Sequence, residues 1–364
     1  MRSSRVEQIS SDALPRQSKL ATVPWVTSLV LITIGFIVFR AAAGSDGFDW
    51  RLFAATLRSL DLGYMAFAFL FILLSYAGRV IRWEVMMRPL GPTPSLSRLF
   101  VGTAIGFTAI VLLGRPGEFV RPWWIARESK TPFSAQIAIW FFERIYDLLI
   151  VILFFGFGLT HLAGSGLLAK AGPQLQTIVS SGGYAALAGA AVCLGFIFVL
   201  RFLDPWQIDA LVGLLDRLPT ALALRLRPIA RSFLHGAAAC CTPGLQPLVF
   251  LYTILEWFII AACYWAIFQA FPFSRFLTLP DIVTIVGLVS FGAIIQLPGI
   301  GGGFQVAAIA VLTQFFAISL EAATSLALVL WGISFTVILP IGILLAIREG
   351  LSFNRLRSLD QETP

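Results

Sequence analysis

Three charged residues lie in the middle of a long apolar segment, where an ionised side chain has little water to solvate it. Glu143, Arg144 and Asp147 occupy the centre of residues 133–159, and an isolated charge at the centre of a bilayer costs at least about 2.5–3.5 kcal/mol. On a helix Asp147 is a neighbour of both other residues, at spacings i,i+4 and i,i+3. One arginine between two carboxylates leaves one negative charge, so we expect Arg115 or Arg121 to join them. The cluster is either part of a substrate or proton pathway or a buried ion network that holds helices in register.

A second cluster combines two arginines, a carboxylate and two glycines. Arg115, Glu118 and Arg121 follow one another at three-residue spacing, which on a helical turn brings them to one face. Guanidinium groups bind phosphate through two parallel N–H donors, and backbone N–H groups at Gly114 and Gly117 add to an anion site. We therefore expect a phosphate group as the ligand. The alternative is a cluster of basic residues at the cytoplasmic surface.

A glycine-rich break lies in the C-terminal half of the chain. Residues 296–305 contain Pro298 and four glycines, so they cannot hold a stable helix and depend on the surrounding structure. The run of glycines is only loosely similar to a phosphate-binding loop. Because no Lys-Ser or Lys-Thr pair follows, it is not a nucleotide P-loop. The candidate binding residues of this break are Gly299, Gly301, Gly302, Gly303 and Gln305.

Three further charged residues are candidates for a role inside the membrane. Glu256 is a lone acid within the apolar residues 248–271, and we expect it to face a cavity rather than the packed core. Arg79 and Arg82 precede Trp83 at the end of an apolar run, a basic and aromatic edge that is typical of a membrane interface. We expect both arginines to extend to lipid headgroups, with substrate binding as a second role.

The chain that carries these residues has the composition of a helical membrane protein. Of its 364 residues 58% are hydrophobic and 12% are charged, and the mean hydropathy is +0.87, whereas soluble domains average about 25% charged residues. The apolar runs are longer than the roughly 10-residue strands of outer-membrane barrels, which excludes that class. We predict an all-α polytopic membrane protein with about 6–8 transmembrane helices. The apolar runs are residues 24–39, 62–78, 97–114, 133–159, 183–203, 248–271, 282–318 and 322–347.

Loop charge predicts which side of the membrane each loop faces, because basic residues collect on the cytoplasmic side. Basic residues concentrate in loops 79–98 and 115–132 and in residues 204–245, which we predict to form an amphipathic cytoplasmic connector. All three segments face the cytoplasmic side of the membrane only if residues 97–114 enter the membrane and return to the same side, rather than cross it. Two cytoplasmic tails, residues 1–22 and 349–364, then flank a transmembrane domain of residues 23–348.

Two interruptions lie at corresponding places in the two halves, at residues 114–118 and 298–303. Paired apolar segments interrupted by Gly and Pro indicate the substrate site of a transporter built from structural repeats. We therefore predict two broken or re-entrant segments and an inverted repeat. The alternative is that both interruptions are ordinary loops between spans.

Net charge and cysteine content exclude other classes of protein. The net charge of +7 comes without a helix-turn-helix or an aromatic and basic pattern for nucleic acid. We assign it to membrane orientation and to contact with anionic lipid headgroups. The four cysteines and two histidines lack metal-binding spacing, so we expect neither a metal nor a cofactor.

Four segments occur in an order that resembles one known family. Residues 78–83 (GRVIRW), 114–121 (GRPGEFVR), 142–147 (FERIYD) and 297–304 (LPGIGGGF) together are similar to the lysylphosphatidylglycerol synthase transmembrane region, or flippase-like domain, family. The resemblance covers about residues 24–350. It implies a multi-pass protein of the bacterial inner membrane, with relatives that move aminoacylated phospholipid between leaflets while a separate soluble domain charges the lipid. We find no such domain in this chain and do not expect aminoacyl transfer.

The resemblance also implies a set of polar site residues and two departures from the family pattern. Gln305 stands where relatives often have Glu, and Trp331 stands where they often have Arg in the last span. If these positions form a charge pair in relatives, both are neutral here, and the preferred headgroup differs. The family's polar positions fall on Arg79, Arg82, Arg115, Glu118, Arg121, Glu143, Arg144 and Asp147.

Together these features predict a flippase or transporter of a phospholipid, an aminoacylated phospholipid or a polyprenyl-linked lipid, and we favour a transporter over an enzyme. The ligand is a lipid with an anionic or zwitterionic headgroup, held at mid-membrane by Arg115 and Arg121. A second copy of the chain or a separate lipid synthase is the expected protein partner, and nucleic acid is not. The alternatives are a membrane-embedded transferase acting on a lipid carrier and a scaffold for a lipid-modifying synthase. The sequence leaves open which lipid moves, in which direction and with what energy coupling.

Overall fold

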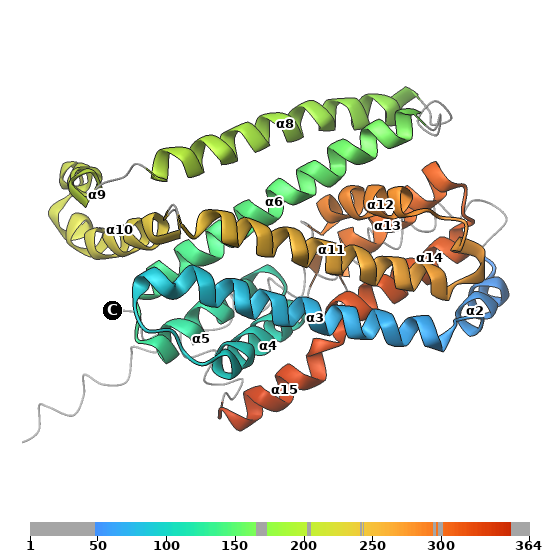
Figure 1. Cartoon of the computed structure of the whole chain (residues 1–364), viewed down its shortest axis with the longest axis horizontal. Coiled ribbons are helices and arrows are strands. Elements are labelled where there is room, and N and C mark those ends of the chain that lie inside the picture. The colour runs from blue at the N-terminus through green and yellow to red at the C-terminus, as the bar shows by residue number, and fades with distance from the viewer. Residues whose placement is uncertain are drawn as a thin grey trace, which may run out of the picture. The chain divides into compact units, whose positions relative to one another are not determined.

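A computed structural model describes residues 48–164, 173–201, 205–240, 242, 244–293, 296–297 and 301–350 of the chain, and most of these residues are helical (Figure 1). The predicted first span, residues 24–39, and most of both predicted tails lie outside the described residues. The helices of the first half are α2 (Trp50–Arg58), α3 (Leu62–Met87), α4 (Leu96–Leu113), α5 (Val120–Ser129), α6 (Phe133–Gly164) and α8 (Pro173–Arg201), with 3-10 turns η1 (Arg88–Leu90) and η2 (Arg115–Phe119).

The second half begins with a short helical connector and ends with a broken helix. The helices are α9 (Pro205–Gly213), α10 (Thr220–Cys240), α11 (Gln246–Ala270), α12 (Leu279–Gly292), α13 (Gly303–Phe316), α14 (Leu320–Trp331) and α15 (Ile338–Arg348). Shorter elements are the 3-10 turns η3 (Leu214–Arg217) and η4 (Pro272–Ser274), the two-residue strands β1 (Gln296–Leu297) and β2 (Gly301–Gly302), and the π-helical turn η5 (Gly332–Thr336). The predicted connector, residues 204–245, therefore consists of α9, η3 and α10.

Six helical segments of the described residues are long and apolar enough to cross a membrane. This confirms an all-α polytopic membrane protein, because about 20 apolar helical residues span the hydrocarbon core. The segments are Leu62–Leu90, Leu96–Leu113, Phe133–Gly164, Ser181–Val199, Gln246–Ala270 and Leu320–Arg348.

Polar residues fix where several of these helices begin. The side chains of Asp49, Asp61, Ser95 and Ser319 each accept a hydrogen bond from a backbone N–H in the first turn of the helix that follows. Such caps satisfy donors that have no partner inside the helix. Each helix therefore starts at the first polar residue ahead of its apolar run.

A long helix followed by a helical hairpin occurs twice in the chain. In the first half α3 is followed by the hairpin α4–α5 and then by α6, and in the second half α11 is followed by the hairpin α12–α13 and then by α14 and α15. In the first hairpin Arg98 at the start of α4 pairs with Glu128 near the end of α5, and Gly106 contacts Arg121 closer to the turn. The chain thus returns to the end at which it entered, as a re-entrant segment requires, although α4 alone is long enough to span.

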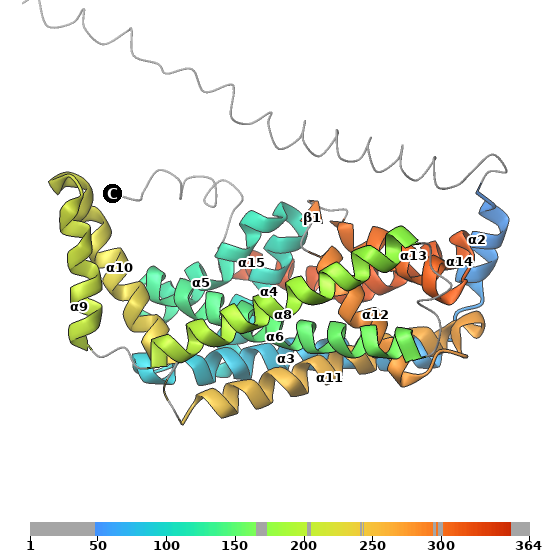
Figure 2. The same ribbon diagram turned by 90° about the horizontal axis from the view of Figure 1, so that it is seen from above.

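The two hairpins enter the molecule from opposite ends. The helices α3 and α11 lie side by side (Figures 1 and 2) and run antiparallel, since the Cys263 thiol contacts the Ala68 carbonyl while Thr253 contacts Arg82. Each hairpin begins at the end where its preceding long helix stops. The tips of the hairpins meet, because Arg115 Nη2 donates a hydrogen bond to the Ala293 carbonyl at 2.7 Å. This is the geometry of an inverted repeat.

One helix of each half of the chain packs on the hairpin of the other half. The helix α6 of the first half packs on α12 of the second hairpin, and α15 of the second half packs on α4 of the first hairpin. Each helix pair has a polar contact at one end. His161 of α6 contacts Asp281 of α12 at 2.8 Å, and Arg98 of α4 contacts Glu349, next to the end of α15, at 2.6 Å. Each hairpin is therefore covered by a helix from the other half of the chain.

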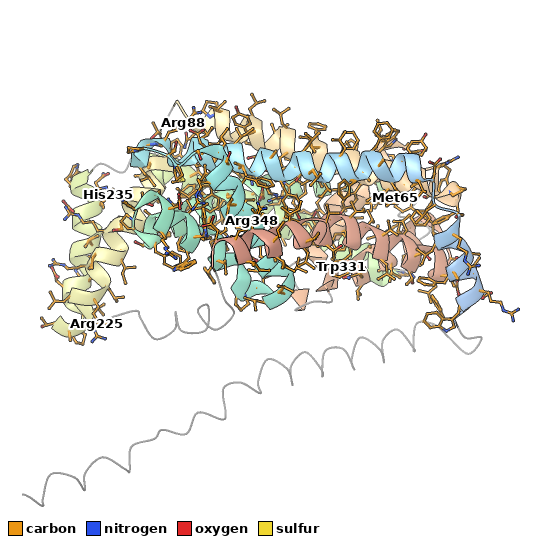
Figure 3. The ribbon with its side chains drawn as sticks, turned by 90° about the horizontal axis from the view of Figure 1, so that it is seen from below. Met65, Arg88, Arg225, His235, Trp331 and Arg348 are labelled. Carbon is orange, nitrogen blue, oxygen red and sulfur yellow. The ribbon has the colours of Figure 1, made fainter. Side chains whose placement is uncertain are left out.

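Arginine residues gather at one end of the long helices. Figure 3 labels Arg88 and Arg225 at the end of the bundle opposite Met65. The helices α9 and α10 lie at the same end, next to the start of α6 (Figures 1 and 2). Among the described residues, the basic side chains at this end include Arg88, Arg98, Arg127, Lys130, Arg217, Arg225, Arg227, Arg231 and Arg348.

The apolar core consists of two clusters of side chains, which follow one another along the long helices α3, α6 and α11. One cluster is built mainly from α11, α12, α13 and α14, and the other from the C-terminal half of α3, from α5 and from the N-terminal half of α6. The boundary between the clusters falls between Tyr76 and Val80 on α3, between Tyr146 and Ile150 on α6, and between Val249 and Trp257 on α11. Arg79, Asp147 and Glu256 lie at this boundary, and Arg82 and Glu143 lie within one helical turn of it.

Candidate functional site

Arg82 of α3 occupies the centre of the charged cluster. Its side chain is 0% exposed, and its Nη1 donates to Asp147 Oδ1 at 2.7 Å and to Thr253 at 3.1 Å. Its Nη2 donates to Glu143 Oε1 at 2.8 Å. One guanidinium therefore joins three helices, α3, α6 and α11, through charge-assisted hydrogen bonds, which are about twice as strong as neutral ones.

Arg121 of α5 engages the same carboxylate from the first hairpin. Its Nη1 lies 3.1 and 3.2 Å from the two oxygens of Glu143, and its Nη2 donates to the Arg79 carbonyl at 3.0 Å. Its guanidinium carbon lies 4.0 Å from the centre of the Trp83 ring, a cation–π contact that favours a buried cation. This pair confirms that an arginine of the interrupted segment reaches Glu143.

Glu256 of α11 lies beside two arginines. Its Oε1 is 2.8 Å from Arg79 Nη2 and its Oε2 is 3.4 Å from Arg82 Nη2. Among the described residues neither oxygen accepts a well-directed hydrogen bond, so the contact is electrostatic rather than a bidentate fork. The next residue, Trp257, donates its indole N–H to Asp147 at 3.2 Å.

Arg144 is the most accessible arginine of the buried network. Its Nη2 lies 3.2 Å from Glu143 and 3.3 Å from Asp147, at longer distances than those of Arg82, and 38% of its side chain is exposed. Both carboxylates are already engaged by other arginines. Arg144 is therefore held loosely at the edge of the network.

The tip of the first hairpin is a tight turn that separates its two arginines. Gly114 adopts a φ of +71°, which L side chains rarely reach, and a 3-10 turn follows from Arg115. In a 3-10 turn, residues three apart lie directly above one another, so Arg115 and Glu118 form an ion pair. At Val120 the chain becomes α-helical, and Arg121 turns to Glu143 instead. The expectation that Glu118 bridges both arginines is therefore wrong in part.

A cavity of about 320 Å³ lies between the hairpin tips and the three long helices. Ligand sites in proteins are typically about 300–1,000 Å³ and are lined by apolar groups with a few polar ones. The apolar wall includes Phe107, Val151, Trp257, Ile260, Tyr264, Phe291 and Phe304. The charged wall consists of Arg79, Arg115, Glu118, Arg144 and Asp147.

The charges of the site fall into two layers. The deep layer consists of Arg82, Arg121, Glu143 and Glu256, which balance one another and are almost fully buried. The cavity wall carries three arginines and two carboxylates, so one positive charge is in excess. Arginine with an excess charge at an accessible wall is suited to an anion, and its planar fork is suited to phosphate.

The structure brings together most of the residues that the sequence singled out. Arg79, Arg82, Arg115, Glu118, Arg121, Glu143, Arg144, Asp147 and Glu256 all belong to the network or to the cavity wall. The expectation that Arg79 and Arg82 extend to lipid headgroups is wrong. The helix α3 continues to Met87, beyond the end of its apolar run, and both arginines find acidic partners on α6 and α11.

The glycine-rich break is described only in part, at residues 296–297 and from Gly301 onward. Gly299 lies outside the described residues, Gly301 and Gly302 form β2, and Gly303 begins α13. Gln305 Oε1 accepts a hydrogen bond from the Gly302 N–H at 2.7 Å and so caps α13. From this segment the cavity wall takes Phe304. Trp331 packs at the edge of an apolar cluster.

Two residues of the network were missed by the sequence analysis. Thr253 accepts a hydrogen bond from Arg82 and Trp257 donates one to Asp147. Both lie within one helical turn of Glu256, so a search for polar groups around that lone acid would have found them. In the part of the chain that the structure describes, no group of three His, Cys, Asp or Glu side chains is placed to hold a metal ion.

Comparison with known families identifies the family of the chain. A family model described as the lysylphosphatidylglycerol synthase TM region matches residues 25–342. The chain belongs to this family. Among curated proteins, none matches the chain. As a member of the lysylphosphatidylglycerol synthase TM region family, the protein is a multi-pass membrane protein, and the matched range includes every residue of the charged network and of the cavity wall.

Proposed function

We propose that this protein moves a lipid with a phosphate-containing headgroup across the membrane, with the headgroup held in the charged cavity. The observation that carries the proposal is the single excess positive charge on the wall of a cavity that lies between two opposed hairpin tips. A phosphodiester with one negative charge would balance this wall. Arg144 is the first contact for the phosphate, because it is accessible and is held at longer distances than its neighbours.

The two carboxylates of the wall extend the range of headgroups. Asp147 and Glu118 line the cavity beside the arginines, so a positive group on the same headgroup, such as an amine, has a partner within reach. A zwitterionic or aminoacylated headgroup thus remains compatible with the site. The excess charge favours anionic lipids over zwitterionic ones.

The opposed hairpins provide a route for movement between leaflets. In transporters built from inverted repeats, the substrate site lies where interrupted helices meet, and one repeat moves against the other around that site. Here the tips are linked by the hydrogen bond from Arg115 to Ala293. Separation of the tips on one side would open the cavity to one leaflet.

The arginine-rich end is assigned to the cytoplasm. Basic residues near the ends of spans are retained on the cytoplasmic side, and here they gather where α9 and α10 lie. This orientation places the end of α15, at Arg348, on the cytoplasmic side. A cytoplasmic N-terminus and a location in the bacterial inner membrane are further parts of the proposal.

The contacts of the two acids of α6 favour a transporter over a membrane-embedded transferase. Glu143 and Asp147 are each bound by arginines at 2.7–3.3 Å, and a carboxylate held in this way is a poor proton acceptor. The same contacts suit a binding site whose charge must stay fixed.

Lipid movement in proteoliposomes tests the proposal directly. Fluorescent phosphatidylglycerol, phosphatidylethanolamine and a polyprenyl phosphate are compared for the wild type, Arg144→Gln, Asp147→Asn, Glu118→Gln and the control Arg231→Gln, an exposed residue of α10. We expect phosphatidylglycerol to move faster than phosphatidylethanolamine in the wild type and the control. Loss of the Arg144 charge should reduce that rate about 10-fold or more, because a charged hydrogen bond contributes about 1.5–3 kcal/mol. Rates equal to those of protein-free vesicles for all three lipids would overturn the proposal.

The Asp147→Asn variant separates transport from a scaffold role. A scaffold for a separate synthase predicts that this change alters assembly and leaves lipid movement untouched. The proposed transporter predicts altered headgroup selectivity while the folded, monodisperse protein is retained.

A further inference from the structure

A second cavity, of about 490 Å³, lies between α6, α8, α12 and α13. Its volume is also in the range of ligand sites. Its wall is almost entirely apolar, with Ile152 and Phe155 from α6, Leu288 from α12 and Val311 and Phe315 from α13. We call this cavity the apolar groove.

The apolar groove adjoins the charged cavity directly. Leu148 of α6 and Phe291 of α12 line both cavities. The change from polar to apolar takes place within two adjacent residues of each helix, because Asp147 and Ser290 line the charged cavity only. A molecule that places a charged group beside Asp147 therefore meets an apolar surface immediately beyond Leu148 and Phe291.

The helix α8 turns its smallest side chains toward the groove. Gly182, Ala185, Ala186 and Gly189 line it at spacings i, i+3, i+4 and i+7, which place them on one helix face. Large apolar residues cover other positions of the same helix, with Leu187 65% exposed and Val192 71% exposed. The small residues keep space open between α8 and α6, whereas the large ones face outward as in a helix that contacts lipid.

We propose that the apolar groove holds a hydrocarbon chain of the same lipid whose phosphate group occupies the charged cavity. This inference rests on the proposed function for the identity of the headgroup. Three observations support a hydrocarbon chain: the groove is apolar, it adjoins the charged cavity through shared side chains, and it is bordered by a helix with a lipid-facing surface. The stripe of small residues points into the chain itself, toward α6, rather than toward a second copy.

The arrangement assigns separate tasks to the two cavities. The charged cavity selects the headgroup, and the apolar groove keeps one chain out of water while the headgroup is at mid-membrane. Apolar surface buried in this way stabilises the bound lipid without regard to headgroup charge. Chain length and branching should therefore affect binding independently of the headgroup.

Two glycines of α8 allow a matched test of the groove. A Cβ atom added at Gly189 or at Gly195 meets no heavy atom within 4 Å, so both positions accept a larger side chain without a packing clash. Gly189 lines the groove and Gly195 does not. Gly189→Leu should fill the groove, and Gly195→Leu should leave it open. Ala185→Leu is a second variant that enters the groove from the same helix face.

The full-length protein in vesicles is labelled with a phosphatidylglycerol that carries a photoreactive diazirine in one acyl chain. The labelled positions are located residue by residue by tandem mass spectrometry, and we expect the wild type and Gly195→Leu to be labelled at groove-lining residues such as Ile152 and Phe155. Gly189→Leu and Ala185→Leu should lose most of this labelling and keep the labelling of outward-facing residues such as Leu187 and Val192. Equal labelling of the groove-lining residues in all four proteins, or labelling of outward-facing residues alone in the wild type, would overturn the proposal.

Binding of the soluble headgroup separates this inference from the proposed function. Glycerol 3-phosphate has no chain, so Gly189→Leu should leave its binding unchanged, while Arg144→Gln should weaken it. If lipid movement fails in every assay but the groove labelling behaves as expected, the chain site stands and transport is wrong. If movement depends on Arg144 but labelling is unaffected by Gly189→Leu, the chain site is wrong and transport stands. A disulfide between two copies through Gly189→Cys would identify the groove as a helix-docking surface instead and overturn the proposal.

Discussion

At the scale of single residues, Arg82 determines how three helices meet. The sequence places it beside a tryptophan at the end of an apolar run, which is the usual pattern of a membrane interface. The structure places it at 0% exposure among Glu143, Asp147 and Thr253. No local pattern separates these two outcomes, because the acids that retain Arg82 lie 61 and 65 positions away in the sequence. The charge balance around residues 143–147 predicted one more arginine, either Arg115 or Arg121, and the structure pairs Arg121 with Glu143.

Removal of Arg82 should destabilise the protein severely. Arg82→Gln leaves two carboxylates of α6 and one of α11 with fewer cations at a buried site, and breaking a buried ion pair typically costs about 3–5 kcal/mol. Thermal denaturation in detergent, followed by tryptophan fluorescence, should show a large fall in the midpoint. Arg88→Gln is the matched control, because that side chain is 50% exposed and pairs with Glu84 at the surface. The double variant Arg82→Gln, Asp147→Asn should recover part of the loss, and equal midpoints for Arg82→Gln and Arg88→Gln would contradict the network.

At the scale of elements, the hairpins could be predicted in outline but not in their packing. The breaks at residues 114–118 and 298–303 indicated where the chain turns, and loop charge indicated that residues 97–114 return to their own side. The packing of α6 and α15 on the hairpin of the other half could not be predicted. It depends on close helix contacts that leave no periodic signal, such as the contact of Gly342 with α4.

A side chain at Gly342 should separate α15 from α4. A Cβ atom there would lie 1.9 Å from Thr108 Oγ1 and 2.5 Å from the Ala104 carbonyl oxygen, so Gly342→Ala forces the helices apart. We expect a loss of about 1–3 kcal/mol in stability, as for other overpacked sites. Gly156→Ala is the control, since nothing lies within 4 Å of that position on α6. A thermal midpoint for Gly342→Ala as high as that of Gly156→Ala would show that α15 does not pack on α4 in this way.

The ion pair between Arg98 and Glu128, which joins the two helices of the first hairpin, should weaken in acid. Hydrogen bonds from Arg98, together with the charges of Arg98 and Arg127, lower the pKa of Glu128 below its ordinary value of 4.5, against the opposing effect of partial burial. A carboxyl whose pKa is lower in the folded protein stabilises the fold above its unfolded pKa, and this contribution is lost as the pH falls through the folded value. Glu128→Gln should therefore be less stable than the wild type at pH 6, by about 1 kcal/mol or less for a pair of this exposure. The difference between their thermal midpoints should shrink below pH 4, and a difference that stays constant from pH 6 to pH 3 would exclude this role for Glu128.

At the scale of the whole molecule, composition was sufficient to predict the class of protein, and the orientation inferred from loop charge stays a prediction. An apolar content of 58% required a membrane protein, and the helices confirm it. The meeting of the hairpin tips was expected only from the correspondence of the two breaks. Their actual contact, from Arg115 to the Ala293 carbonyl, depends on the three-dimensional path of both hairpins and has no counterpart in the sequence.

The proposed orientation predicts which residues are accessible from outside the cell. Arg58 ends α2, Arg225 belongs to α10, and both are exposed. The helices α2 and α10 lie at opposite ends of the long helices (Figure 1). In a cysteine-free background, Arg58→Cys should react with a membrane-impermeant maleimide on intact cells. Arg225→Cys should react only after the cells are permeabilised. The reverse pattern would invert the topology and place the arginine-rich end outside.

The packing of α15 on α4 also determines when, during synthesis of the chain, the first hairpin is covered. Arg98 of the first hairpin pairs with Glu349, which lies 251 positions later in the chain. At about 5–20 residues per second, a ribosome needs about 10–50 s to make the chain between them. During that interval the first hairpin has entered the bilayer but lacks the helix that covers α4. A chain that stops before α15 therefore leaves one side of the apolar helix α4 without its packing partner, so the first hairpin is completed only when the last helix has been made.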